Sequence, residues 1–88
     1  MKIVGKTEDG LKALAGIFVY RDTHGLPLML IADSLKRHNY IIALDHFVRE
    51  AVEHGWSKSK AIADLREYIL YEHGVSEGVK VMARLEAL

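Results

Sequence analysis

Four repeated signals for the end of a helix constrain the fold of this chain more than any other feature. A histidine followed by glycine or asparagine, and then by an apolar or aromatic residue, occurs at 24–26, 38–40, 54–56 and 73–75. A cation in the last turn complements the negative end of the helix dipole. The glycine or asparagine then takes the left-handed conformation that commonly follows a helix. Four such stops predict five helices.

The segments between these stops have a helical spacing of apolar residues and recognisable starts. Thr7, Ser57 and Ser76 stand where N-cap residues are expected, and Pro27 suits the first position of a helix. A chain of this length without a linker-like tract forms one domain, so we treat residues 1–88 as a single helical domain. We predict an all-α fold, a helical bundle of five short helices at 7–24, 27–38, 40–54, 57–73 and 76–87.

Residues 16–20 leave a second interpretation open. Gly16 weakens a helix, and the run Ile-Phe-Val-Tyr after it favours a strand. The apolar stripe formed by Leu11, Leu14 and Phe18 favours the helix. A short strand at this place is therefore the alternative to a continuous first helix.

Composition limits the function classes open to the chain. Twelve Lys and Arg residues balance twelve Asp and Glu residues, which weighs against a non-specific nucleic-acid coat. The absence of cysteine excludes disulfides, thiol nucleophiles and cysteine-based zinc sites. The longest apolar run, 13–20, is far shorter than the roughly 20 residues of a membrane span, and residues 1–6 lack the apolar core of a signal peptide. We therefore expect a cytoplasmic protein without membrane contact.

No group of residues has the pattern of a catalytic site. The sequence contains no Gly-x-Ser-x-Gly, P-loop or Gly-x-Gly-x-x-Gly motif. Asp22, Asp33, Asp45 and Asp64 are scattered and form no recognisable pair. We therefore expect no enzymatic activity and no cofactor.

His46, Glu50 and His54 raise the separate question of a metal site. Their spacing of four residues places both imidazoles and the carboxylate on one stripe of a helix, where they could bind zinc. No further ligand is evident, and charged neighbours suggest a solvated face. We expect no metal site, and leave binding by these three residues as an open alternative.

The start of the helix predicted from Ser57 departs from the usual charge pattern. The first turn of a helix favours acidic residues, yet Lys58 and Lys60 stand there beside the hydroxyls of Ser57 and Ser59. Free backbone N–H groups, two hydroxyls and two ammonium groups are suited to an anion. These four residues are therefore the candidate anion- or nucleic-acid-binding site. The other interpretation is that acidic residues of the preceding helix neutralise the lysines.

The same segment resembles two known families. Residues 51–57 (Ala-x-x-x-Gly-x-Ser) resemble the turn of helix-turn-helix proteins over about 47–68, which implies that the helix from Ser57 reads nucleic acid. Residues 55–65 (Gly-Trp-Ser-x-x-x-Ala-Ile-x-x-Leu) resemble ubiquitin-associated three-helix modules over about 47–85. That second resemblance implies that Trp56 and its loop belong to a partner-binding patch.

Trp56, Tyr68 and Tyr71 are the candidate partner-binding residues. Trp56 either packs on the preceding helix or, where exposed, anchors a partner, since tryptophan is enriched in binding hot spots. We therefore expect a small non-enzymatic regulatory or adaptor module that binds a protein partner or forms a homodimer. The alternative is a helix-turn-helix-like DNA- or RNA-binding regulator that uses the helix starting at Ser57.

Overall fold

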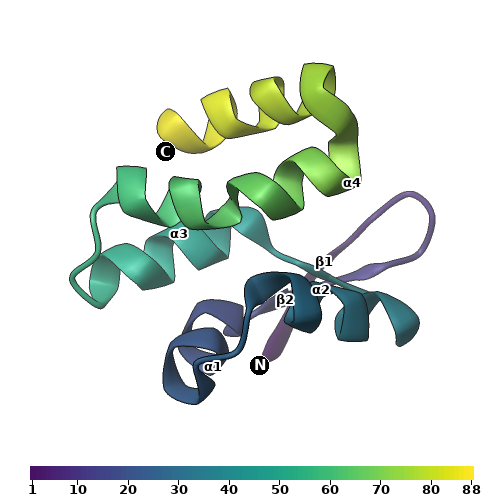
Figure 1. Ribbon diagram of the computed structural model, residues 1–88. Coiled ribbons are helices and arrows are strands. Elements are labelled where there is room, and N and C mark those ends of the chain that lie inside the picture. The colour runs from purple at the N-terminus through teal and green to yellow at the C-terminus, as the bar shows by residue number, and fades with distance from the viewer.

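The computed structural model describes residues 1–88 and has a mixed α/β architecture (Figure 1). The prediction of an all-α helical bundle with five helices is therefore wrong. Three strands and four helices follow one another in the order β1 (Lys2–Lys6), β2 (Lys12–Ala15), α1 (Ile17–His24), α2 (Leu28–Arg37), β3 (Tyr40–Ile42), α3 (Leu44–Glu53) and α4 (Lys58–Glu86). None of these helices is both long and apolar enough to cross a bilayer.

The strands form one small sheet in the order β1-β2-β3, with β2 in the centre. β1 and β2 are antiparallel and are joined by a turn, whereas β2 and β3 are parallel and are joined through α1 and α2. In this register Ala13 lies beside Gly5 on one side and beside Ile41 on the other. An irregularity between Ile3 and Gly5 interrupts the pairing of β1.

The predicted helix at 7–24 begins ten residues too early because its first half forms the turn and the second strand of a β-hairpin. Thr7 closes the hairpin turn: its backbone N–H donates to the Leu11 carbonyl (2.8 Å), and its hydroxyl accepts from the Leu11 N–H (3.0 Å). Leu14 is buried on the core face of β2, whereas Ala13 and Ala15 on the opposite face are half-buried and Lys12 at the start of the strand is exposed. The strand alternative at 16–20 is also wrong, because α1 begins at Ile17.

The predicted helix at 40–54 begins too early for a similar reason. Tyr40, Ile41 and Ile42 pair with β2 as a parallel strand, and α3 follows from Leu44. Aromatic and β-branched residues favour this extended conformation. The pairing partner lies far away in the sequence, so local spacing does not reveal it.

The four helix-ending signals are confirmed in the backbone. The residue after each histidine has a positive φ: Gly25 (64°), Asn39 (65°), Gly55 (92°) and Gly74 (77°). In His38 and His54 the ring Nδ1 lies 2.9 and 2.8 Å from the carbonyl oxygen four residues earlier. These imidazoles therefore bond to carbonyls at helix ends, as the sequence predicts.

Gly74 divides α4 into two arms that fold back on each other. Its dihedral angles (φ 77°, ψ 174°) are not helical, and the chain reverses there between a first arm (58–73) and a second arm (75–86) (Figure 1). The arms match the predicted helices at 57–73 and 76–87 closely. Lys58 Nζ donates to the carbonyl oxygens of Glu86 (2.6 Å) and Leu88 (2.9 Å), which fastens the end of the second arm to the start of the first.

The core lies where α1, α3 and the first arm of α4 meet. Its most deeply buried side chains are Phe18, Phe47, Ile17, Leu65, Ile69 and Val48. Leu14 and Ile42 contribute one face of the sheet to this core, and α2 contributes Leu28, Ile31 and Ala32. In Figure 1 α1 and α2 lie on one side of the molecule and the second arm of α4 on the other, while the first arm of α4 packs directly against α2.

Gly78 allows the two arms of α4 to approach closely. A Cβ added there would lie 2.9 Å from Leu70 Cδ2 and 3.5 Å from Leu70 Cα. Gly78→Ala changes stability little, because the end of Leu70 can rotate and alanine favours the helix by up to about 1 kcal/mol. Gly78→Phe lowers the free energy of unfolding by about 1–3 kcal/mol, since no space exists for the ring. Urea denaturation of both variants checks this difference, and equal stabilities would contradict the close approach of the arms.

Candidate functional site

The three predicted partner-binding residues do not form one surface. Trp56 is partly buried, and its ring meets Phe18 edge to face with centroids 5.0 Å apart. Tyr68 is 3% exposed, and burial followed by the negative charge of Glu72 raises the pKa of its hydroxyl far above the ordinary value. Tyr71 is exposed, but it lies about 20 Å further along the helix than Trp56. Only Tyr71 is fully open to a partner.

The predicted anion-binding residues have partners inside the protein. The Ser57 hydroxyl accepts from the Lys60 backbone N–H (3.1 Å), as expected of an N-cap residue. Lys58 bonds to the carbonyls at the chain end, and Lys60 Nζ lies 4.1 Å from the centroid of the Trp56 ring. Ser59 is exposed. The two lysines therefore interact with a chain end and an aromatic ring, not with acidic residues of α3.

His46, Glu50 and His54 are not brought together as metal ligands. The Glu50 carboxylate accepts from the Gly16 backbone N–H (2.8 Å) and so supports the start of α1. The His54 ring bonds to a carbonyl at the end of its own helix. No three His, Cys, Asp or Glu side chains converge anywhere in the protein.

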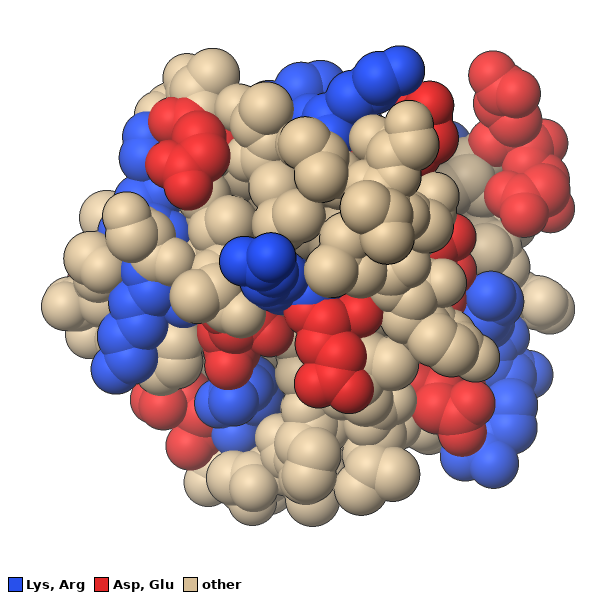
Figure 2. Space-filling model, turned by 45° about the horizontal axis from the view of Figure 1, so that its top comes forward, with Lys and Arg blue, Asp and Glu red and all other residues tan.

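The other cations of the helices are mostly paired with carboxylates. Lys36 pairs with Glu72 (3.2 Å), and Arg21 pairs with Asp64 (2.8 Å). Burial raises the pKa of the Asp64 carboxyl, although the charges of Arg21 and Lys60 act in the opposite direction. On the face drawn in Figure 2, blue and red residues alternate with broad uncharged areas. This face therefore lacks a continuous basic stripe of the kind that binds nucleic acid.

A groove of about 540 Å³ lies between the sheet and the second arm of α4. Its floor includes Gly5, Ala13 and Ile41, which face away from the side of the sheet that α2 covers. Its opposite wall is formed by apolar residues of the second arm and its end: Val81 and Leu85, which are buried, and Leu88, which is 48% exposed. The groove is open to solvent and is larger than three other hollows of the protein, which have volumes of about 410, 300 and 190 Å³.

Small residues create this groove. Gly5 and Ala13 are neighbours in the β1–β2 register, and a Cβ added to Gly5 would lie 3.8 Å from the Ala13 Cβ. Two of the three floor residues therefore rise little above the backbone. The second arm of α4 does not pack closely on this face, so Ala13 and Ile41 remain partly exposed to solvent.

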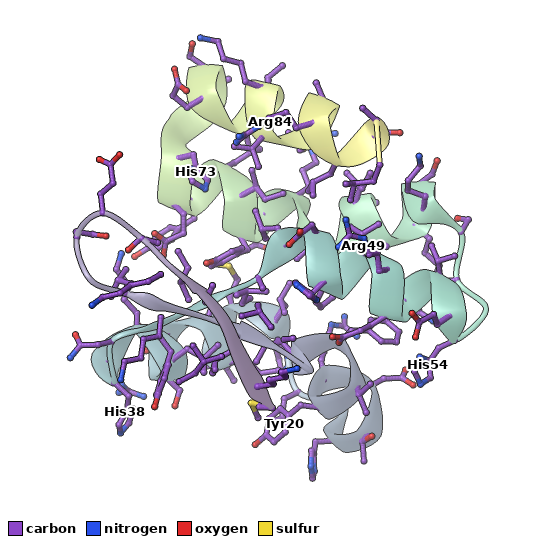
Figure 3. The ribbon with its side chains drawn as sticks, turned by 180° about the vertical axis from the view of Figure 1, so that it is seen from behind. Tyr20, His38, Arg49, His54, His73 and Arg84 are labelled. Carbon is purple, nitrogen blue, oxygen red and sulfur yellow. The ribbon has the colours of Figure 1, made fainter.

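The groove carries more basic than acidic side chains, although the protein as a whole is neutral. Lys6 and Arg84 line it, against one acidic side chain, Asp45, and the histidines His46 and His73 also line it. Neither Lys6 nor Arg84 forms an ion pair, whereas Asp45 is already paired with Arg49 (3.5 Å). Figure 3 places His73 and Arg84 on the two arms of α4, on the side that faces the hairpin. The charge and the apolar floor together suit an occupant that carries both apolar groups and negative charge.

Comparison of the chain with protein-family models, with curated proteins and with solved structures returned no match. The functional argument therefore depends on the groove itself. Sequence reasoning missed this groove because its floor joins three strands, of which β2 and β3 were expected to be parts of helices and β1 was assigned to no element. The only local sign is Gly5, a small residue inside the otherwise strand-forming run Lys2–Lys6.

Proposed function

We propose that the protein is a small non-enzymatic interaction module that binds a segment of a protein partner in the groove between the sheet and α4. The observation that carries this proposal is the hollow beside the second arm, whose apolar floor is only partly covered by the protein. Solvent-exposed apolar hollows of several hundred Å³ are typical of binding sites. The apolar residues of the lining outnumber its polar ones, which favours binding over catalysis.

A protein segment suits this groove better than a nucleic acid does. Nine of the sixteen residues that line the groove are apolar, whereas nucleic-acid interfaces are polar and strongly basic. The alternative function, nucleic-acid binding by the helix that starts at Ser57, has less support. Lys58 and Lys60 would first have to leave the partners that they have in the folded protein.

Selection of peptides from a random display library tests the proposal. The immobilised protein is expected to enrich peptides whose affinity falls at least tenfold, or about 1.4 kcal/mol, when Gly5→Val fills the floor. Gly5 has no positive φ and valine favours strands, so this variant keeps the fold. Ile3→Val, on the other face of β1, is the matched control and leaves binding unchanged.

Two results would count against the groove. Enriched peptides that bind Gly5→Val as tightly as the unaltered protein would place the site elsewhere. Salt-sensitive binding of duplex DNA that is lost in a Lys58→Ala, Lys60→Ala double variant would support the nucleic-acid alternative instead. Thermal melts of every variant show whether a change in binding reflects a change in folding.

A further inference from the structure

We infer, on the basis of the proposed function, how the partner segment binds: an acidic, extended peptide adds as a fourth strand along the free edge of β1. Three features lead to this inference. They are the unpaired edge of β1, the access that Gly5 gives to the groove, and the unpaired lysines at this edge. Each concerns the same few residues of the hairpin.

β1 is an edge strand that no other part of the protein covers. It is hydrogen-bonded to β2 alone, and all five of its residues are exposed. The backbone N–H and C=O groups on its outer side therefore have no strand partner, and such an edge can pair with another chain. Four consecutive residues, 4–7, also line the groove, so the groove lies directly along this edge.

Gly5 connects the free edge with the apolar floor. A strand added beside β1 directs every second side chain toward the groove. Since Gly5 has no side chain, an apolar side chain of the added strand can reach over it to Ala13. The wall residues Val81 and Leu85 lie across the same groove. Strand addition of this kind takes affinity from backbone hydrogen bonds and specificity from alternate side chains.

The charges at this edge favour an acidic strand. Lys2 and Lys6 stand at the two ends of β1, and Lys6 is the register partner of Lys12. Two like charges directly opposite each other on neighbouring strands destabilise a sheet. None of these three lysines has a carboxylate partner in the protein. Asp or Glu side chains on an added strand would supply the missing partners.

A second copy of this chain fits the edge poorly. Antiparallel pairing of two β1 strands about Val4 places each Lys2 opposite the other copy's Lys6. That arrangement brings two further pairs of like charges together at the edge. The added strand is therefore expected to come from a different, acidic chain.

Synthetic peptides with alternating valine and glutamate test the inference directly. The acidic peptide is expected to bind at least tenfold more tightly at low salt than the same peptide with lysine in place of glutamate. It should also shift the amide NMR signals of residues 2–6. Alternate amides of a strand face the same neighbour, so N-methylation of one alternate set should abolish binding while methylation of the other set should not.

Lys6→Glu provides a charge-reversal variant that keeps the fold. It replaces a like-charged pair with Lys12 by an opposite-charged pair, so its melting temperature is expected to rise slightly. The acidic peptide should lose at least tenfold in affinity for this variant, and the lysine peptide should gain. Equal affinity of both peptides for the unaltered protein would overturn the acidic specificity.

The failure of strand addition is distinguishable from the failure of the proposed function. If both N-methylated peptides bind as the parent does and Gly5→Val still weakens them, strand addition is wrong while binding in the groove stands. If Gly5→Val binds every peptide normally, both proposals fail. A dimer of the free protein in sedimentation experiments, dissociated by Val4→Pro, would show that a second copy occupies the edge and would also overturn the inference.

Discussion

Phe18→Ala is expected to lower the free energy of unfolding by about 3–5 kcal/mol, the usual cost of removing a fully buried aromatic ring. Phe18 is 0% exposed, and its ring lies 5.4 Å from the ring of Phe47 and 5.0 Å from that of Trp56. It therefore joins α1 to α3 and to the loop before α4. A loss of this size is a large part of the total stability of a small domain, and denaturant titration measures it.

Val19→Ala is the matched control on the same helix. Val19 is 42% exposed, so this change should alter stability by no more than about 0.5 kcal/mol. The fluorescence of Trp56, the single tryptophan, gives a second measurement, because removal of the Phe18 ring exposes the indole to water. Equal costs for the two variants would contradict the core as described.

Gly16→Ala is expected to destabilise the protein by about 1–3 kcal/mol, the cost of a strained backbone conformation. Gly16 has φ 91°, a conformation that residues with a side chain rarely adopt. A Cβ added there would also lie 3.1 Å from the Met1 Cα. If residues 7–24 formed a continuous helix, Gly16→Ala would instead stabilise the protein, because alanine in a helix interior is more stable than glycine by about 1 kcal/mol. The direction of the change therefore distinguishes the two folds.

Gly5→Ala is the control for this second prediction. Gly5 has no positive φ, and its added Cβ makes an ordinary contact of 3.8 Å, so alanine should be tolerated there. Thermal or denaturant unfolding of both variants gives the comparison. A Gly16→Ala variant more stable than the unaltered protein would contradict the left-handed turn between β2 and α1.

The parts of the fold that were predicted correctly are those marked by local signals in the sequence. Helix ends at Gly25, Asn39, Gly55 and Gly74 depend on a few adjacent residues, and all four were predicted. The strands were missed because they are only three to five residues long, and so short a run fits helical spacing and strand alternation equally well. The parallel partner of Lys12 is Tyr40, and such distant pairing leaves no local signal.

The candidate site was harder to predict than the fold, because it depends even more on contacts between residues distant in the sequence. The unusual lysines after Ser57 were noticed in the sequence, but their partners are a chain end and the ring of Trp56. These partners are distant in the sequence or depend on the fold, so the role of the two lysines could not be predicted from the sequence. The groove requires Gly5 beside Ala13 and the reversal at Gly74, which brings Val81 and Leu85 across from them. Each residue has an ordinary interpretation when it is read alone.

The floor of the groove is the claim on which both proposals depend, and NMR tests it most directly. Nuclear Overhauser contacts between backbone protons should join Gly5 to Ala13 and Ala13 to Ile41, since these residues are register partners. Such contacts would place the small residues side by side in one sheet. A continuous series of sequential amide-to-amide contacts over residues 7–16, with no contact between Ala13 and Ile41, would instead indicate a helix and would contradict the account.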